Sequence, residues 1–158
     1  MNAVKIFNEK SVDELMITDI DATVKNVEPN YSLIEKLANE SRMPLCYGGG
    51  INNAQQAKEV FSLGVEKIAI SSSAIKDPTI ITKIAESVGS QSVVVVIDVK
   101  KKYLSNNYQI YTHNSTRKTG INPLKFINQI KEMGVGEIVI NSIAVSYTHL
   151  RAHETSID

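Results

Sequence analysis

Asp98 is the side chain whose place in the sequence points most clearly to chemistry. It follows the unbroken apolar run Val93–Ile97, which predicts a strand buried on both faces, as in a parallel sheet. A carboxylate at the end of such a strand is unfavourable unless it is paired or used, and catalytic groups gather at the carboxyl ends of parallel strands. We therefore predict that Asp98 transfers protons in catalysis, with a structural hydrogen-bonding role as the alternative.

Other charged side chains lie at or near predicted strand ends. Asp19 and Asp21 stand at the corresponding end of an earlier strand, 14–19. One of them should face the site while the other caps the next segment, and position favours Asp19 as the second catalytic carboxylate. Lys100 could neutralise a phosphate, although the lysine run 100–102 is also typical of a solvated surface.

Glycines and serines follow two neighbouring predicted strands. A glycine triplet, 48–50, comes after the strand at 44–47, and a serine run, 71–73, ends at the next strand, 67–72. Glycine lets backbone N–H groups approach a phosphate closely, and serine adds hydroxyl donors. The two segments predict one phosphate cradle, with a tight turn and a helix-capping serine loop as the simpler alternatives. The residues assigned to the cradle are Gly49, Gly50, Ser71 and Ser72.

An internal repeat places charged residues at the start of three strands. Residues 63–72 read LGVEKIAISS, residues 133–142 read MGVGEIVINS, and residues 10–19, KSVDELMITD, are a weaker copy. Alternate strands of a barrel supply the side chains of one interior layer, so these charges should meet at the N-terminal mouth. Two acids flanking one base suggest an ion-paired ring, and a solvated rim is the alternative. The three residues are Glu14, Lys67 and Glu137.

Helix-like and strand-like segments alternate along the chain, which predicts a parallel sheet with helices outside. The internal repeat favours a (β/α)8 TIM barrel over a doubly wound sheet. Five strands are present, so the barrel should be incomplete, with its first and last strands missing. Strands are expected at 14–19, 44–47, 67–72, 92–99 and 137–142, helices at 3–10, 31–40, 53–64, 77–89 and 122–134, and a small hairpin around 108–112 within a polar insertion, 101–121.

Composition excludes several classes of protein. The 158 residues contain 17 Lys+Arg and 17 Asp+Glu, so no basic surplus favours nucleic acid or an anionic membrane. The single cysteine, Cys46, rules out an intrachain disulfide and a cysteine-cluster metal site, which fits a cytoplasmic protein. The histidines, His113, His149 and His153, lack ligand spacing with carboxylates, so no metal is expected. No apolar run is long enough to span a bilayer.

Six stretches in unbroken order resemble the cyclase subunit of imidazole glycerol phosphate synthase, a histidine-biosynthesis family. They are DELMITDIDAT (13–23), PLCYGGGI (44–51), EKIAISSSAIKDP (66–78), GSQSVVVVIDVK (89–100), RKTGI (117–121) and GEIVINSI (136–143). The resemblance implies a (β/α)8 barrel lyase without a cofactor. It implies that a bis-phosphorylated ribulosyl-formimino precursor and ammonia give imidazole glycerol phosphate and an aminoimidazole carboxamide ribonucleotide. The ammonia is expected to come through the barrel from a glutaminase subunit in a heterodimer.

The resemblance also implies roles for single residues. Asp98 matches the family's fifth-strand aspartate, one of two that act as general acid and base. Other residues match a phosphate site, where the family often has Asn and Thr in place of the serines, and the charged gate of the ammonia entrance. The substrate-binding candidates are Gly49, Gly50, Ser71, Ser72, Lys100 and Ser142, and the gate and channel candidates are Glu14, Lys67, Glu137 and Gln91.

The sequence departs from the family's pattern at both ends. The family's first strand, with its aspartate and a nearby lysine, should precede residue 1. After residue 143 the family's Asp-rich, Gly-containing loop is replaced by AVSYTHLRAHETSID, and residues 146–158 resemble a translated sequencing-adaptor remnant. We expect residues 1–143 to form a partial (β/α)8 barrel domain and residues 144–158 to be a non-native tail.

Three alternatives stay open. The segments 19–23 and 26–30 look slightly more like a cyclase-like paralogue that serves surface-polysaccharide sugar amidination. The 158-residue chain could be a non-catalytic fragment, since it lacks one of the two aspartates. A generic phosphate-binding isomerase barrel is the third alternative, but an isomerase has no reason to gate ammonia.

Overall fold

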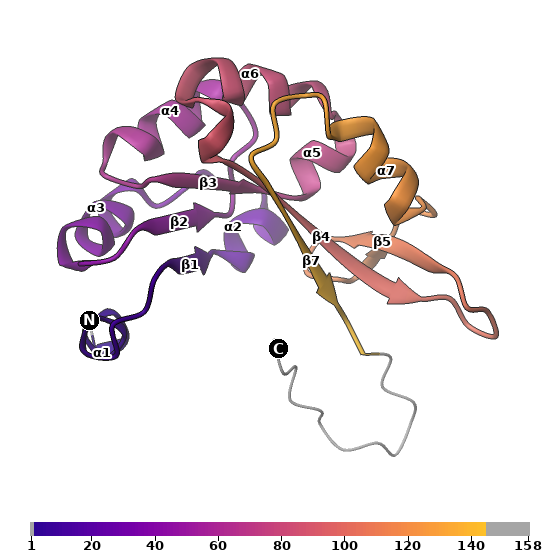
Figure 1. Ribbon diagram of the computed structural model, residues 1–158, viewed down its shortest axis with the longest axis horizontal. Helices are drawn as coiled ribbons and strands as arrows, with labels where there is room; N and C mark the ends of the chain where they lie inside the picture. The colour runs from indigo at the N-terminus through magenta and orange to yellow at the C-terminus, as the bar shows by residue number, and fades with distance from the viewer. Residues whose placement is uncertain (1, 145–158) are drawn as a thin grey trace.

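The computed structural model describes residues 2–144 as helices packed on a mostly parallel sheet (Figure 1). The elements are α1 (Asn2–Glu9), β1 (Leu15–Thr18), α2 (Ile20–Lys25), α3 (Tyr31–Glu40), β2 (Leu45–Gly48), α4 (Ala54–Ser62), β3 (Lys67–Ile70), α5 (Ser72–Lys76), α6 (Thr79–Val88), the 3-10 helix η1 (Ser90–Ser92), β4 (Val93–Lys101), β5 (Tyr108–Thr112), β6 (Arg117–Lys118), α7 (Pro123–Ile130) and β7 (Glu137–Ser142). The predicted tail, 144–158, lies outside the described residues except for its first residue.

Five parallel strands form the scaffold. They lie side by side in the order β1, β2, β3, β4 and β7, with a helical connection between successive strands. Consecutive parallel pairing through outer helices is how a (β/α)8 barrel is built. The chain is therefore an incomplete barrel of this kind, as the sequence predicted, and β1 and β7 form the two edges of its described part.

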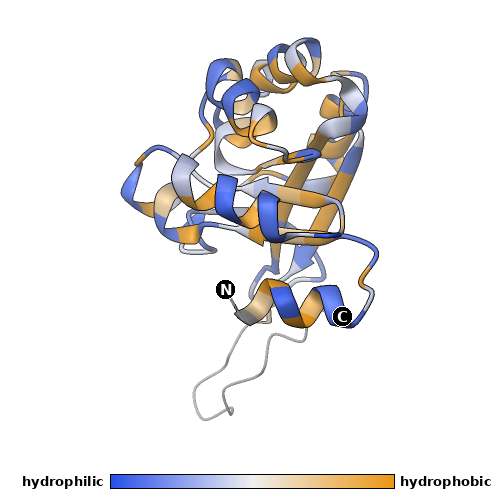
Figure 2. Ribbon diagram, turned by 90° about the vertical axis from the view of Figure 1, so that its left-hand side faces the viewer, coloured by the Kyte–Doolittle hydropathy of each residue, from blue (hydrophilic) through white to orange (hydrophobic). Residues whose placement is uncertain are grey.

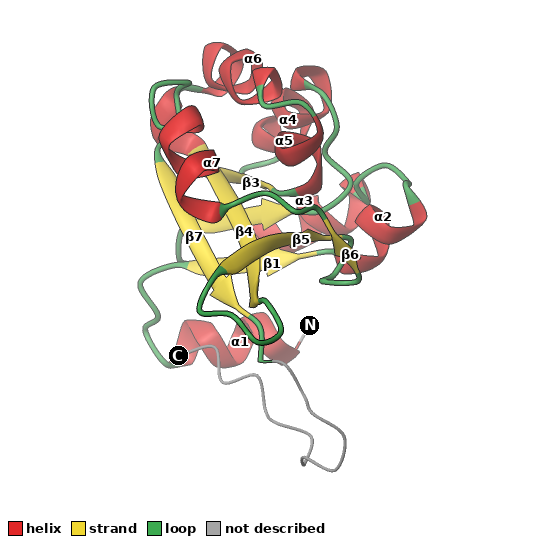
Figure 3. Cartoon of the chain, turned by 90° about the vertical axis from the view of Figure 1, so that its right-hand side faces the viewer, coloured by secondary structure: helices red, strands yellow, loops and turns green. Residues whose placement is uncertain are grey.

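An antiparallel excursion is added to the barrel at β4. β4 is nine residues long, whereas β3 has four, and β3 pairs only with Val93–Val95. The remaining length pairs with β5, from Asp98 opposite Tyr111 to Lys101 opposite Tyr108, while β7 lies on the other side (Figure 3). The hairpin predicted around 108–112 is thus confirmed, and it sits beyond the carboxyl end of β3.

The core has two layers because strand side chains alternate between the two faces of the sheet. The larger cluster fills the space between sheet and helices; from β4 it contains Val93, Val95, Ile97 and Val99. The opposite, inner face holds a small cluster of Cys46, Ala69 and Val94, against which Val96 and Val139 pack. Figure 2 shows the apolar strands and the hydrophilic outer turns of the helices. Burial of both faces of β4, predicted from its valine run, is confirmed.

Asparagine caps set the start of three helices. The side chains of Asn30, Asn53 and Asn122 each accept a hydrogen bond from the backbone N–H three residues on. This satisfies one of the orphan donors at a helix start and contributes about 1 kcal/mol. The sequence predicted α3, α4 and α7 at these places but missed α2 and α5, which are six and five residues long.

Candidate functional site

The candidate site lies at the carboxyl rim of the parallel strands. β1 runs into Asp19, β2 into the glycine triplet, β3 into the serine run, and β4 carries Asp98. Because the strands are parallel and adjacent, these ends meet at one edge of the sheet. The strand ends that carry the glycine triplet, the serine run and Asp98 therefore meet at one rim, as the sequence predicted.

Asp98 is half-buried on the inner face, and both of its carboxylate oxygens accept hydrogen bonds. Ser115 Oγ donates to Oδ2 at 3.0 Å, and Asn141 Nδ2 donates to Oδ1 at 3.1 Å. Asn141 lies directly opposite Asp98 in the β4–β7 ladder, and Ser115 comes from the turn between β5 and β6. The carboxylate is therefore held from two sides, with its position fixed relative to the rim.

The turn after β5 connects Asp98 with the serine run. His113 donates its backbone N–H to Ser72 Oγ at 3.3 Å, while Ser115 reaches Asp98. The turn lies there because β5 extends β4 past the end of β3. Burial and the neighbouring Arg117 guanidinium lower the pKa of His113, so its imidazole is neutral at physiological pH.

Of the two aspartates after β1, one was expected to face the site and the other to cap the next segment. Asp19, favoured for the site, is the residue that caps α2: its Oδ1 accepts from the Ala22 N–H at 3.0 Å. Asp21 is exposed and pairs with Lys25 at 3.1 Å. Asp19 is still half-buried at the rim beside Gly49, so its catalytic role stays a prediction.

The glycine triplet is required by packing. Gly49 and Gly50 have φ of +124° and +71°, values that favour glycine. A Cβ at Gly49 would collide with the carbonyl oxygen of Asp19, and a Cβ at Gly50 would lie 2.6 Å from that of Val27. The Gly50 N–H lies 3.5 Å from Thr23 Oγ1. These contacts support the tight-turn interpretation, and phosphate binding here stays a prediction.

The serine run begins α5. Ser71 is the residue before the first helical turn, and its side chain makes no capping hydrogen bond. Ser72 Oγ accepts from the hairpin turn, and Ser73 Oγ is buried without a hydrogen-bond partner in the described structure. The hydroxyls that were predicted to bind phosphate are therefore at the rim but do not cap the helix.

Lys100 belongs to the hairpin. Its Nζ donates to the Ser115 carbonyl at 2.8 Å and lies 4.6 Å from the centroid of the Tyr111 ring. This fixes a positive charge two residues from Asp98 on the same face of β4. Lys100 is thus not simply a solvated lysine, and its predicted part in substrate binding is not decided by these contacts.

The charged residues at the strand starts form an ion-paired cluster. Lys67 Nζ lies 2.9 Å from Glu14 Oε2 and 3.0 Å from Glu137 Oε2. These hydrogen bonds, to Glu14 first, raise the pKa of Lys67 above its usual range. The pairing favours the predicted ring over a solvated rim, although a role as ammonia gate is not tested by it.

Two further candidates lie at opposite ends of the sheet. Gln91 is exposed in η1, which packs so closely on Gly136 that a Cβ there would meet the Gln91 Cα at 2.9 Å. Gln91 is therefore next to the strand that Glu137 opens. Ser142 is the exposed last residue of β7, opposite Val99 in the ladder. Neither of the predicted roles is tested by this placement.

Between the ion-paired cluster and Asp98 the inner face is apolar. Cys46 is fully buried there, and burial, with a smaller contribution from the charge of Glu14, raises the pKa of its thiol to about 12. On the outer face of the same strand, the Tyr47 Oη is buried without a partner among the described residues. Burial, reinforced by the charge of Asp19, raises the pKa of Tyr47 to about 12.

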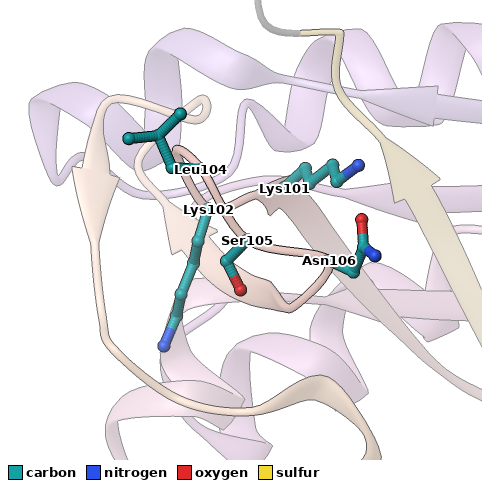
Figure 4. A pocket seen from close by; sticks show the side chains of 5 residues that line it. All are labelled: Lys101, Lys102, Leu104, Ser105 and Asn106. Carbon is teal, nitrogen blue, oxygen red and sulfur yellow. The ribbon is translucent and has the colours of Figure 1, made fainter.

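Other features of the described residues carry less chemistry. No group of three or more His, Cys, Asp or Glu within residues 2–144 could hold a metal ion, and no described helix is long and apolar enough to cross a membrane. A shallow polar groove of about 310 Å³ is lined by five residues of the 102–107 turn and the end of β4 (Figure 4). It lies at the far end of the hairpin from Asp98. Its lining residues are Lys101, Lys102, Leu104, Ser105 and Asn106.

Sequence reasoning missed the two partners of Asp98. Asn141 stands at a strand end with the right polarity, and an alignment of β4 with β7 would have placed it opposite Asp98. Nothing in the sequence signals Ser115, because its contact depends on the register of the hairpin. The link between Ser72 and the hairpin turn was missed for the same reason.

Comparison with known proteins places these features in a family. The family described as "Histidine biosynthesis protein" matches residues 1–146. A protein of Leptospira borgpetersenii, provisionally named imidazole glycerol phosphate synthase subunit HisF, is 55% identical over 90% of this chain and 56% of its own length. One of Vibrio vulnificus, provisionally named subunit hisF3, is 50% identical over 90% of this chain and 55% of its own. The subunit HisF of Chloroherpeton thalassium is 35% identical over 90% of this chain and 56% of its own length.

The chain spans just over half the length of these curated relatives. The family match covers the residues that form the parallel scaffold, and the relatives are 35–55% identical over 90% of the chain. The chain therefore belongs to the histidine biosynthesis protein family and is related to its HisF-type imidazole glycerol phosphate synthase subunits.

Proposed function

We propose that this chain is part of an ammonia-using cyclase and lyase of histidine biosynthesis. The substrate is a bis-phosphorylated ribulosyl-formimino precursor, and the products are imidazole glycerol phosphate and an aminoimidazole carboxamide ribonucleotide. A glutaminase subunit supplies the ammonia in the cytoplasm. Residues 1–143 form the barrel part, and the sequence of residues 144–158 is a non-native tail.

One observation carries the proposal: a charged cluster and a hydrogen-bonded carboxylate lie at opposite ends of one inner face. Glu137 and Asn141 are four residues apart on β7, which spans about 13 Å at 3.3 Å per residue. The face between them is lined by Cys46, Ala69 and Val94. Apolar walls penalise ammonium far more than neutral ammonia. This arrangement suits a passage for ammonia that starts at Lys67 and ends at Asp98.

The rim supplies the remaining parts of the proposal. Asp98 acts as the general acid or base, and its hydrogen bonds to Ser115 and Asn141 hold it in place. Gly49, Gly50, Ser71 and Ser72 hold one substrate phosphate, with the Lys100 charge nearby. Asp19, at the end of the first described strand, is the second carboxylate candidate. The glutaminase docks at the other end, over Glu14, Lys67 and Glu137, with Gln91 at its edge.

The acid–base role of Asp98 is tested in the full-length protein supplied with the precursor and free ammonium. Asp98→Asn keeps the planar shape of the side chain and one of its two accepting oxygens but removes the ionisable group, so turnover should fall by roughly 10²–10⁴-fold while KM changes little. Asp21→Asn is the matched control, because Asp21 is exposed and pairs with Lys25 on the same helix. Equal turnover in the Asp98 variant and the control would remove Asp98 from the mechanism.

The gate role of Lys67 is tested by comparing two nitrogen sources. Lys67→Met should lower the glutamine-driven rate more than the ammonium-driven rate, because only the first depends on transfer from the partner. Lys25→Met, at an exposed ion pair on α2, is the control. An equal fall in both rates would contradict a gate, and it would favour a generic barrel enzyme without ammonia transfer.

A second candidate is favoured by the pattern of identities. Four relatives whose names are marked as provisional, among them hisF3 of Vibrio vulnificus and hisF2 of Pseudomonas aeruginosa, are 48–55% identical, whereas four named HisF without that mark are 35–36% identical. We infer that the chain comes from a paralogous branch, which fits a cyclase-like partner in surface-polysaccharide sugar amidination. Failure of the full-length protein to convert the histidine precursor, combined with glutamine-dependent amidination of a nucleotide sugar by its partner, would select this candidate.

The 158-residue chain alone is proposed to be inactive. It presents five parallel strands within residues 2–144, and its open edges leave the rim incomplete. Ammonium-dependent turnover by this chain, measured with the same precursor, would contradict the fragment interpretation.

A further inference from the structure

We propose that Ser115 is a positioning residue that fixes the Asp98 carboxylate for proton transfer, and that Lys100 sets Ser115 in place. The proposal rests on the proposed acid–base role of Asp98. It concerns a residue outside the segments that carry the family resemblance, on the turn between β5 and β6. Ser115 acts through Asp98 and is not assigned a contact with substrate.

The geometry at Asp98 is that of a two-sided clamp. Ser115 Oγ holds Oδ2 from the hairpin side at 3.0 Å, and Asn141 Nδ2 holds Oδ1 from the β7 side at 3.1 Å. Two donors on different oxygens define the plane of the carboxylate, whereas one donor leaves it free to rotate about χ2. Hydrogen bonds to a charged acceptor are stronger than those between neutral groups, so loss of either donor should change the orientation of the carboxylate.

The backbone of the turn shows that a serine is kept here against its conformational preference. His113, Asn114 and Ser115 have φ of 51°, 54° and 63°, three successive left-handed residues without a glycine. Asparagine tolerates this region, but serine does so poorly, and glycine would be the favoured residue at 115. A strained residue whose side chain contacts a functional group is a candidate for function rather than for stability.

Three hydrogen bonds and one cation–π contact hold the turn in its left-handed conformation. Lys100 Nζ donates to the Ser115 carbonyl at 2.8 Å, and the same ammonium lies over the Tyr111 ring. Thr116 Oγ1 donates to the His113 carbonyl at 2.6 Å, and Ser72 Oγ accepts the His113 N–H. Lys100 therefore acts on Asp98 through Ser115, and the turn couples Asp98 to the start of α5.

Ser115→Gly is the decisive variant, because it removes the hydroxyl and relieves the backbone at the same time. Leu104→Gly is its matched control: Leu104 is also left-handed, at φ 55°, in the other turn of the same excursion, and its side chain is 89% exposed. Ser115→Asn is the rescue, since asparagine accepts a left-handed φ and its amide can donate to the carboxylate. Turnover, KM and urea unfolding are measured for each variant in the full-length protein with ammonium as nitrogen source.

We expect Ser115→Gly to lower kcat about tenfold and to leave KM unchanged. A tenfold fall in kcat corresponds to a rise of about 1.4 kcal/mol in the activation free energy. The free energy of unfolding of Ser115→Gly should equal or exceed that of the unsubstituted protein. Leu104→Gly should show the same stability effect but keep the original kcat. Ser115→Asn should recover most of the loss. Lys100→Met should lower kcat as Ser115→Gly does and should also raise KM, because the Lys100 charge is proposed to lie near the substrate phosphate. Unchanged kcat in Ser115→Gly, in a protein where Asp98→Asn abolishes turnover, would overturn the positioning role but leave the proposed function intact.

A second measurement on the 158-residue chain does not depend on catalysis. The ¹³Cγ resonance of Asp98 should move in Ser115→Gly and stay in place in Leu104→Gly, because only the first removes a donor from the carboxylate. If both variants leave this resonance unchanged, the hydrogen bond is absent and the proposal fails. If Asp98→Asn left turnover unchanged, the proposed function would be refuted instead, and the positioning role with it.

Discussion

Replacing Gly49 by alanine tests whether the glycine triplet is kept for packing. At φ +124° an alanine is strained by roughly 1–3 kcal/mol. Its Cβ would also lie 2.8 Å from the Asp19 Cβ and collide with the Asp19 carbonyl oxygen, and overpacking of this kind costs about 1–3 kcal/mol. The two effects together predict that Gly49→Ala lowers the free energy of unfolding by roughly 4 kcal/mol, a large part of the 5–15 kcal/mol typical of a domain.

The control separates the backbone effect from the collision. Gly120 also has a positive φ, +74°, but a Cβ there would meet nothing within 4 Å. Gly120→Ala should therefore cost only about 1–2 kcal/mol. Urea unfolding followed by circular dichroism measures both variants, and a common slope would show that the midpoints report stability. If Gly49→Ala cost no more than Gly120→Ala, the close approach of Gly49 to Asp19 would be refuted.

Three further predictions follow from buried and paired groups. Tyr47→Phe should leave the free energy of unfolding unchanged or raise it by about 1 kcal/mol in urea titrations. The reason is that the buried Tyr47 Oη has no hydrogen-bond partner among the described residues. A decrease of more than about 1 kcal/mol would show that Oη has a partner. Cys46, whose thiol pKa is raised to about 12, should resist a thiol reagent at pH 8 until urea unfolds the chain, and rapid native labelling would contradict its burial. Lys67→Met should cost about 1 kcal/mol at pH 7 for two partly exposed ion pairs. Because the folded pKa of Lys67 is raised, this difference should be constant from pH 7 to the unfolded lysine pKa of about 10.4 and shrink as pH rises through the folded pKa. A difference that grew above pH 7 would refute the pairing.

Local chemistry made much of the scaffold predictable. The helix α3 and the strand β7 have the bounds expected from apolar spacing, and Asn53 caps α4 as its sequence suggests. The run Val93–Ile97 predicted a strand buried on both faces because it has no polar alternation. Such features depend on a few neighbouring residues, so sequence alone was sufficient.

The site was less predictable because it depends on register. The sequence placed Asp98 at a strand end, but its bonds to Ser115 and Asn141 are set by how β4 pairs with the hairpin and with β7. Short elements failed for a related reason: α2 and α5 are too short for an apolar period to appear. The capping bond of Asp19 was not foreseen, because a cap and a site residue can occupy the same strand end.

The unequal lengths of β3 and β4 have a consequence for how this protein can vary. The antiparallel excursion pairs with the parallel sheet only along the carboxyl half of β4, so changes in the length of its outer turn leave the ladders that join β1, β2, β3, β4 and β7 intact. The excursion nevertheless delivers the residue that orients Asp98. Under the proposed role of Ser115, substitutions in this hairpin change the orientation of Asp98 while the parallel ladders of the barrel stay the same. Related chains can then differ in rate while they share one architecture.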